Sequence, residues 1–400
     1  MNILIVTEVF YPEIFHVNDF AQAMVERGHQ VKVMTRQPSY PQGHVFEGYS
    51  NQKYSVEKWG EIEIHRFDVI EGYRDSKIKK IENYFHYVQR GKKVIKELID
   101  GIDIIIVYQT GPLSVALPAI YAKKKYGIPV IVWTFDIWPD TVYMYGFPQL
   151  FPISTTVNYI IKQVYGNADA VMVSSRRFTD TIHQYIPDAD IFYAPNWQIP
   201  AEKKTTSLVF DKSKINFVFT GNVSKAQNMG NTIRGFAKAN IDNAVLNIVG
   251  DGSTLEHEKS VAEELGCKNV IFHGRVPYNE VGDVLDVCNF LVLPLTPNSG
   301  IDKTEPFKLQ SYLKSGKPIL GIIRGAGREI IEENELGICC DPLDIDDISR
   351  GFREMLDLSE HDKQMIKMSS KKLLETRFNK DMILNTIEKL AHKVCKSKFS

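Results

Sequence analysis

The sequence predicts two α/β domains, each built on a parallel β-sheet with helices on both faces. Short apolar runs alternate with amphipathic helical stretches along nearly the whole chain, which is the pattern of doubly wound sheets. The pattern lapses once, between about 191 and 216, where a polar stretch without periodicity is typical of an interdomain linker. At 400 residues the chain is also long enough for two cores of comparable size.

The first half begins with an apolar run at Ile3–Thr7, as expected for a strand buried on both faces. A helix is expected over Asn18–Arg27, ended by Gly28. Further strands are expected at Gln30–Thr35, Ile104–Tyr108, Pro129–Phe135 and Ala170–Ser174. Residues 1–198 are therefore predicted to form one Rossmann-like domain.

A second strand series fills residues 199–379, which we predict to be a second Rossmann-like domain. Its expected strands are Asn216–Thr220, Val245–Val249, Val270–His273, Asn289–Pro294 and Pro318–Ile323. An amphipathic helix follows from about 380 to the end at 400, and we expect it to pack back on the first domain. Two such domains facing each other would enclose a central cleft lined by the carboxyl ends of both sheets.

Composition excludes several classes of protein. A net charge of −1 argues against nucleic acid as the main partner, because phosphate binding favours a strong basic excess. Five cysteines without metal-binding spacing predict reduced thiols of a cytoplasmic protein and neither a metal site nor a bound cofactor. The start of the chain resembles a core strand and not a signal peptide, and no apolar run approaches the ~18 residues that span a bilayer. Any membrane contact is expected to be peripheral.

Three strand ends in the second half carry glycines. Gly221 and Asn222 follow a strand and precede a loop with Lys225, a pattern that suits a phosphate; a tight turn with a solvated lysine is the alternative. The next strand ends at Gly250 in a GxG turn, which is weak evidence for nucleotide binding. A third ends in Gly-Arg275-Val276, where the arginine either contacts a base or phosphate or is an ordinary surface residue.

The most specific segment is the loop Pro294–Lys303 and the helix expected after it. Thr304 is predicted as the N-cap, with Pro306 in the first turn. The backbone N–H groups of Phe307 and Lys308, with the Lys308 side chain beside them, would then form an anion site.

The ordered motifs of the second half resemble the donor domain of retaining glycosyltransferases of family 4, which have the GT-B fold. They are GNVSKAQ, VGDG, HGRVP and PFKLQSYLKSGKPIL. The first half is similar to the same family in FYPEIFHVNDF, SYPQGHVFEGY, WTFDIWPD and APNW. The resemblance covers essentially the whole chain and is strongest to the branch of N-acetyl-L-fucosamine transferases of O-antigen and capsule pathways.

The resemblance implies metal-independent transfer of an N-acetylated or deoxy hexose from a UDP-sugar to a polyprenyl-diphosphate-linked saccharide. The wider family has two glutamates eight positions apart in this segment, where the chain has Lys303 and Ser311, and Gln310 is a candidate ribose partner. Of the family's basic pair on the diphosphate, Lys225 matches one member, while Asn222 stands in place of the usual arginine.

Lys225 and Lys308 are the groups expected to stabilise the departing diphosphate. On the first domain, the resemblance gives His16 and Asn18 as candidates on the acceptor side, with a satisfied loop histidine as the alternative. Asp136 falls where relatives place a histidine that contacts the donor sugar. It would orient a hydroxyl or accept the acceptor's proton, or else only cap the turn before Trp138.

The segment Lys77–Lys96 holds seven basic residues, one acid and three aromatic residues. A basic, aromatic helix suits the anionic inner face of the plasma membrane, where lipid-linked acceptors lie; the alternative is a solvated helix whose aromatic residues belong to the core.

Two other functions remain open at this stage. One is a GT-B enzyme that epimerises a UDP-sugar without an acceptor. The other is a nucleotide-sugar-binding protein without catalysis, which the absence of the two glutamates favours.

Overall fold

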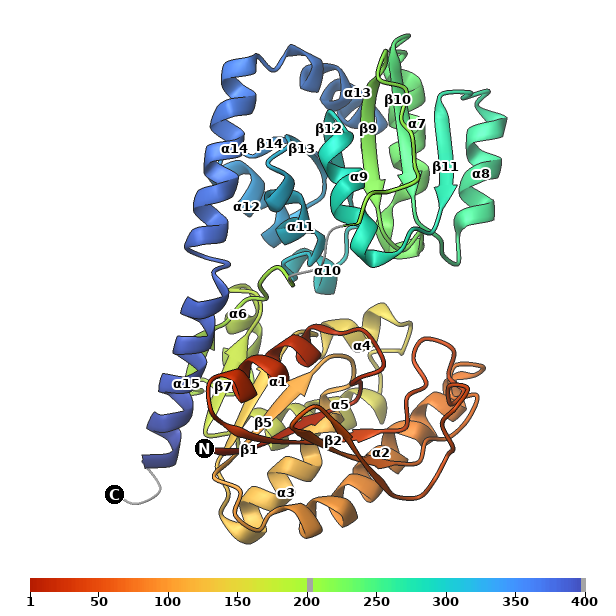
Figure 1. The fold of residues 1–400 in the computed structure, drawn as a ribbon. Coiled ribbons are helices and arrows are strands. Elements are labelled where there is room, and N and C mark those ends of the chain that lie inside the picture. The colour runs from red at the N-terminus through yellow and green to blue at the C-terminus, as the bar shows by residue number, and fades with distance from the viewer. Residues whose placement is uncertain (200–203, 397–400) are drawn as a thin grey trace. The chain divides into compact units, whose positions relative to one another are not determined.

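The computed structural model describes residues 1–199 and 204–396, so the middle of the expected linker, 200–203, and the last four residues lie outside it. The chain forms two compact units. Unit 1 comprises Met1–Pro195 and the chain from Ile383, and unit 2 comprises Asn196–Met382. Each unit is a Rossmann-like α/β domain, so the predicted fold class is confirmed (Figure 1).

Unit 1 has an eight-stranded sheet of order β3-β4-β2-β1-β5-β6-β7-β8. The strands are β1 Asn2–Thr7, β2 Gln30–Arg36, β3 Ser55–Trp59, β4 Ile62–Phe67, β5 Ile104–Gln109, β6 Val130–Thr134, β7 Ala170–Val173 and β8 Ile191–Tyr193. The expected strands are all present, but β3, β4 and β8 were not expected. All neighbouring pairs are parallel except β3 and β4, which form a hairpin around Gly60 and Glu61.

Helices cover the sheet of unit 1. They are α1 His16–Glu26, α2 Lys77–Leu98, η1 Leu113–Ala116, α3 Leu117–Tyr126, α4 Asp140–Met144, α5 Ile153–Tyr165 and α6 Phe178–His183. One apolar core joins α2, α3, α5 and α6 to the strands. The C-terminal helix α15, Lys380–Lys396, is fixed to this unit where Glu388 pairs with Arg27 at 2.6 Å and with His29 at 2.8 Å.

Unit 2 has a six-stranded sheet of order β11-β10-β9-β12-β13-β14, and every neighbouring pair is parallel. The strands are β9 Ile215–Thr220, β10 Ala244–Val249, β11 Val270–Gly274, β12 Phe290–Pro294, β13 Ile319–Ile322 and β14 Gly337–Cys340. Five of these were predicted within two residues of their observed bounds; β14 was missed.

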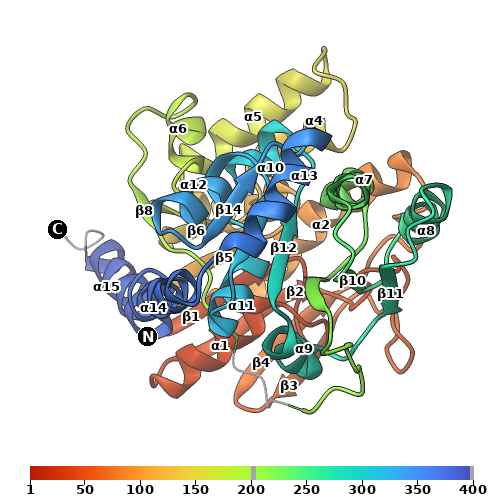
Figure 2. The same ribbon diagram turned by 90° about the horizontal axis from the view of Figure 1, so that it is seen from above.

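Two apolar cores lie on the two faces of this sheet. One joins the sheet to α7 Met229–Ala239, α8 Leu255–Glu264 and α13 Ile345–Glu354. The other joins it to α9 Val281–Val287, α11 Lys308–Ser315, α12 Gly325–Glu333 and α14 Glu360–Glu375. Figure 2 shows β12 between α7 and α9. Short elements complete the unit: η2 Lys225–Gln227, η3 Tyr278–Glu280, α10 Ser299–Lys303 and η4 Met355–Asp357.

The parallel strands have one consequence for function. Parallel strands place their carboxyl ends at the same edge, so β1, β5 and β6 end together in unit 1, as do β9, β10 and β11 in unit 2. Ligands of doubly wound folds bind outside this edge.

Close packing of α7 on α13 yields a test of the fold. A Cβ added at Gly235 would lie 2.2 Å from Ile348 Cγ2, so Gly235→Ala should destabilise unit 2 by about 1–3 kcal/mol through overpacking. Gly282→Ala, in α9 with nothing within 4 Å, is the matched control and should be neutral or slightly stabilising. Scanning calorimetry that finds the same unfolding midpoint for both variants would contradict this packing.

Candidate functional site

In unit 2 the loops after β9 and β10 touch through their backbones. The Gly221 N–H donates to the Val249 carbonyl at 2.9 Å, and the Gly250 N–H donates to the Gly274 carbonyl at 2.7 Å. Gly250 has φ +154, and a Cβ there would lie 1.8 Å from the Gly221 oxygen. The glycine at 250 is therefore needed for close approach of the two loops, whether or not it contacts a donor.

Lys308, the first residue of α11, extends across the end of β9. A Cβ on Gly221 would lie 2.5 Å from Lys308 Cε, so only glycine leaves room for the lysine. The amine donates a hydrogen bond to Gln227 Oε1 and lies 4.1 Å from the centre of the Phe219 ring. The structure thus brings together two predicted segments, the loop from Gly221 to Lys225 and the start of α11.

The Lys308 amine is a buried cation without an anionic partner. Its residue is partly exposed as a whole, but the amine end is covered by Phe219 and Gly221. Among the residues that the structure describes, no carboxylate forms an ion pair with it, and burial lowers the pKa of Lys308 to about 7. A buried ammonium is costly without a counter-charge, so this position suits an anionic ligand.

The predicted cap of α11 is wrong. Thr304 is the C-cap of the short helix α10, where its hydroxyl donates to the Gly300 carbonyl at 2.8 Å. Asn298 caps the start of α10 and accepts from the N–H groups of Gly300 and Ile301 at 3.1 and 2.9 Å. Because this extra helix occupies the loop, α11 begins only at Lys308, with Phe307 in the N-cap position.

An ion pair that sequence reasoning missed holds the segment before α11. Glu305 is buried and accepts from Arg377 Nη2 at 2.9 Å, and Arg377 follows the end of α14. This contact fixes the chain two residues before the exposed Phe307 and so helps to place Lys308.

Other predicted donor residues lie at the surface of unit 2. Lys225 is exposed in η2, and its carbonyl accepts from the Thr296 hydroxyl at 2.5 Å. Asn222 is exposed beside Gly221, and Arg275 is exposed after β11. Val276 packs against an apolar core. The contacts of these side chains with a donor remain predictions.

Two positions of α11 bear on the expected ribose contact. The Gln310 side chain is buried, whereas the Ser311 hydroxyl donates to Gln198 Oε1 at 3.0 Å. Lys303, at the place of the other family glutamate, ends α10. The contact between Gln310 and a ribose remains a prediction, and it requires a change in this buried side chain.

In unit 1, Asp136 follows β6 and binds the loop after β5. Its carboxylate accepts from the Gly111 N–H, and its carbonyl accepts from Gln109 Nε2 at 3.1 Å. Burial raises the pKa of Asp136 to about 6; the Gly111 hydrogen bond opposes this rise and the negative charge of Glu8 adds to it. The hydrogen bond of this carboxylate thus goes to a neighbouring strand end and not to the turn before Trp138.

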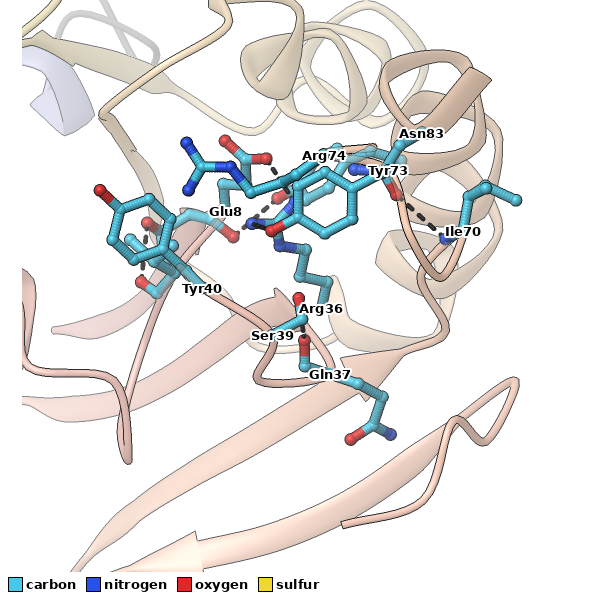
Figure 3. A network of polar contacts seen from close by, with 12 residues as sticks. Glu8, Arg36, Gln37, Ser39, Tyr40, Ile70, Tyr73, Arg74 and Asn83 are labelled. Carbon is cyan, nitrogen blue, oxygen red and sulfur yellow. Dashed lines mark hydrogen bonds and ion pairs between the residues drawn. The ribbon is translucent and has the colours of Figure 1, made fainter. Parts of the chain in front are cut away.

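A buried polar network, which the sequence did not reveal, lies around Arg36 (Figure 3). Arg36 is only 2% exposed; its Nη1 donates to Glu8 Oε1 at 2.5 Å and its Nη2 donates to the Tyr73 hydroxyl at 2.8 Å. Arg74 lies 5.1 Å from the centre of the Tyr40 ring in the same region.

The two acceptor-side candidates are largely enclosed. His16 is buried at the start of α1, with its ring 6.4 Å from that of Tyr108 and 6.2 Å from that of Trp133. Asn18 donates to the Glu13 carbonyl at 2.7 Å. Both residues lie in the first turn of α1, so His16 is not in a loop as expected, and an acceptor contact remains a prediction for each.

Glu13 organises the loops after β1 and β2. Its buried carboxylate accepts three backbone N–H groups, from Phe10 at 3.1 Å, Ser39 at 2.9 Å and Tyr40 at 2.7 Å. Burial raises the pKa of Glu13, and Arg36 and these hydrogen bonds oppose the rise.

The segment Lys77–Lys96 lies within α2. Of its three aromatic residues, Tyr87 belongs to the core and Phe85 is exposed. Lys77 donates to the Gly146 carbonyl at 3.1 Å, and Lys80 lies 4.3 Å from the centre of the Tyr145 ring. These contacts join the start of α2 to the loop between α4 and α5, whose Leu150 and Phe151 are 69% and 84% exposed.

Within 1–199 and 204–396, no three His, Cys, Asp or Glu side chains gather as a metal site would require. In the same ranges, no helix has the length and apolarity needed to cross a bilayer.

Comparison with known protein families decides the class. Residues 15–197 match the model described as Glycosyltransferase Family 4, and residues 200–372 match the model described as Glycosyl transferases group 1. The chain is a glycosyltransferase. The boundary between the two family matches, at 197–200, lies close to the boundary between units 1 and 2 at Pro195 and Asn196.

Two relatives share about a fifth of their residues with the glycosyltransferase. It is 21% identical to a probable glycosyltransferase, WbjE, of Pseudomonas aeruginosa over 266 residues, which is 64% of this chain and 66%, just under two thirds, of that protein. It is 22% identical to a putative colanic acid biosynthesis glycosyl transferase, WcaI, of Escherichia coli over 393 residues, which is 90% of this chain and 93% of that protein.

Solved structures with the GT-B fold align along the whole chain. The sucrose-phosphate synthase of Thermosynechococcus elongatus has a TM-score of 0.74 at 13% identity, covering 99% of this chain and 100% of that one. WaaG, a glycosyltransferase involved in lipopolysaccharide biosynthesis, has a TM-score of 0.66 at 15% identity, covering 98% and 99%. At such identities the likeness shows the fold alone.

Proposed function

We propose that this glycosyltransferase moves a sugar from a UDP-sugar to a lipid-linked saccharide and retains the configuration of the donor. The observation that carries the proposal is the buried Lys308 amine at the end of β9. This amine can carry a positive charge, and an anionic ligand would supply the counter-charge that it lacks. The similarity to WcaI and WaaG, which are described as glycosyltransferases of colanic acid and lipopolysaccharide biosynthesis, supports a cell-surface polysaccharide as the product.

Charge stabilisation in unit 2 would drive departure of the nucleoside diphosphate. Negative charge grows on the diphosphate as the glycosidic bond breaks, and a cation held in place near it lowers the barrier. Lys308 is already positioned by Gln227 and Phe219, so little reorganisation is needed. Lys225, exposed in the adjoining η2, is the second cation of this proposal, which needs no metal ion.

Asp136 is proposed to act on the acceptor in unit 1. With a pKa of about 6 it is mainly ionised at pH 7, and it is basic enough to accept a hydroxyl proton. The resemblance to retaining enzymes implies attack on the same face from which the diphosphate leaves.

The resemblance to fucosamine transferases favours an N-acetylated or deoxy hexose as the donor sugar. Two alternatives are another two-Rossmann enzyme, a UDP-sugar 2-epimerase, and a binding protein without catalysis, the latter favoured by Lys303 and Ser311 in place of the two family glutamates. A 2-epimerase would convert UDP-sugar without acceptor, and a silent binding protein would bind UDP without turnover. Assays of donor consumption with and without lipid-linked saccharide distinguish the three.

Binding of UDP should be coupled to proton uptake by Lys308. The free amine has a pKa of about 7, and a diphosphate beside it would raise that pKa, so the complex holds more protons above pH 7. UDP, fully ionised there, should therefore bind more weakly as pH rises from 7 to 9. Calorimetry in buffers of different ionisation enthalpy measures this uptake.

In the same experiment Lys308→Met should weaken UDP binding by about 1.5–3 kcal/mol and abolish the proton uptake. Lys314→Met, an exposed change on the same helix, is the matched control. Equal affinities and equal proton uptake in the two variants would remove Lys308 from the donor site.

Asp136→Asn should reduce turnover by about 100-fold or more, because the amide cannot accept a proton, while UDP affinity stays unchanged. In the wild type, turnover should fall as pH decreases below about 6, where Asp136 becomes protonated. Asp140→Asn in the first turn of α4 serves as control. Near-normal turnover in Asp136→Asn would show that Asp136 has only a structural role, as the acceptor of the Gly111 hydrogen bond.

Peripheral membrane binding is proposed through α2 and the loop that carries Leu150 and Phe151. Each basic residue near an anionic surface contributes about 1 kcal/mol, so binding should weaken steeply with salt. Changing four α2 lysines to serine should lower vesicle binding by up to about 1,000-fold but spare UDP binding (Lys79, Lys80, Lys92 and Lys93).

Four lysines of α14 provide the control (Lys363, Lys367, Lys371 and Lys372). If vesicle binding did not change with salt, with lipid charge or with the α2 substitutions, α2 would be an ordinary solvated helix.

A further inference from the structure

Two carboxylates flank one glycine at the carboxyl end of the unit 1 sheet. Glu8 follows β1, Gly111 follows β5 and Asp136 follows β6, three strands that are neighbours in the order β1-β5-β6. The Gly111 N–H donates to Asp136 Oδ2, and a Cβ at Gly111 would lie 3.0 Å from Glu8 Oε2. The carboxylates therefore approach Gly111 from its two sides.

Glu8 is held in place from behind. Its Oε1 accepts from Arg36 Nη1 at 2.5 Å, and Arg36 is itself fixed by the Tyr73 hydroxyl at 2.8 Å (Figure 3). One carboxylate oxygen thus binds the buried arginine, while the other lies on the side of Gly111. A carboxylate bound in this way keeps its direction.

Unpartnered polar atoms lie at the carboxyl ends of β2 and β5. Within the described part of the chain, Gln109 Oε1, Thr110 Oγ1 and Arg36 Nε are buried without a hydrogen-bond partner. Gln109 is fully buried, and its amide nitrogen binds the Gly111 carbonyl at 2.6 Å. Buried polar atoms nearly always have partners, so these atoms indicate a ligand or bound water at this edge.

We infer that Glu8 is a second functional carboxylate of unit 1, which together with Asp136 binds two hydroxyl or amide N–H groups of the acceptor sugar around Gly111. The inference rests on the proposed function, since it needs a saccharide acceptor. Ionised carboxylates only accept hydrogen bonds, and adjacent hydroxyls of a sugar donate them. The pair therefore selects a sugar that is uncharged at these positions and disfavours one that carries phosphate or carboxylate there.

Glu8 also acts on the titration of Asp136. The other titratable groups that interact with Asp136 are Tyr108 of β5, Tyr145 after α4 and Tyr165 of α5. The pKa of each tyrosine is raised above its ordinary value, so all three are neutral at pH 5 to 8. Of these four neighbours, Glu8 is therefore the one whose charge raises the pKa of Asp136 in this range.

Glu8→Gln tests the inference with the full-length enzyme, UDP-sugar and a lipid-linked saccharide in detergent. We expect the KM for the acceptor to rise about tenfold or more, with the KM for the donor within about twofold. The acid limb of the turnover–pH profile should move to lower pH, because loss of the Glu8 charge lowers the pKa of Asp136.

Glu57→Gln is the matched control, because Glu57 is the carboxylate partner of Arg66, another buried arginine of the same unit, at 2.5 Å. Both variants lose an arginine partner, but only Glu8→Gln should change the acceptor KM and the pH profile. Glu8→Asp keeps the charge and the ion pair with a shorter side chain. Glu8→Asp should raise the acceptor KM without moving the acid limb of the pH profile. It provides a second test of the inference if Glu8→Gln does not fold.

Normal acceptor KM values in both Glu8 variants would overturn the inference while the proposed function stands. A wild-type enzyme that binds UDP but transfers to no lipid-linked saccharide would instead overturn the proposed function, and the inference with it.

Discussion

The physical constraint on which the candidate site of unit 2 depends is the burial of one ammonium group at the end of β9. The Lys308 amine has left bulk water for a position between the Phe219 ring and Gly221, with a single hydrogen bond to Gln227. Burial of a charge without a partner costs free energy, which the protein reduces by lowering the pKa to about 7. Such a cost is explained if a ligand supplies the missing anion. The lack of a side chain at Gly221 and the contact of Gly250 with it then serve the same purpose, since both leave room at this position.

The two units carry opposite charges at corresponding edges of their sheets. In unit 2 the proposed functional charge is the cation Lys308, and in unit 1 it is the proposed pair of carboxylates, Glu8 and Asp136, around Gly111. A cation suits the diphosphate that leaves, whereas carboxylates suit the hydroxyl groups that approach. Glu8 and Asp136 follow strands β1 and β6, whereas Lys308 begins helix α11 and brings its amine to the end of β9.

Much of the fold could be predicted because its strands are nearly continuous apolar runs, as in Ile3–Thr7 and Val245–Val249. The hairpin strand β3 was missed since polar residues alternate along it, and α10 was missed because five residues carry no periodicity. Lys308 was found from its motif, but its burial depends on contacts with Phe219 and Gln227, about 80 residues away along the chain. The Glu8–Arg36 pair also joins separate strands, and no local pattern reveals it.

The central claim is that Lys308 is a buried amine that becomes fully charged when a diphosphate binds. Its pKa can be measured directly by NMR titration of lysine labelled at Cε, with Lys308→Met used for assignment. The account predicts a pKa near 7 in the free enzyme and a value raised well above 7 when UDP is bound. An ordinary pKa near 10.5, unchanged by UDP, would contradict it.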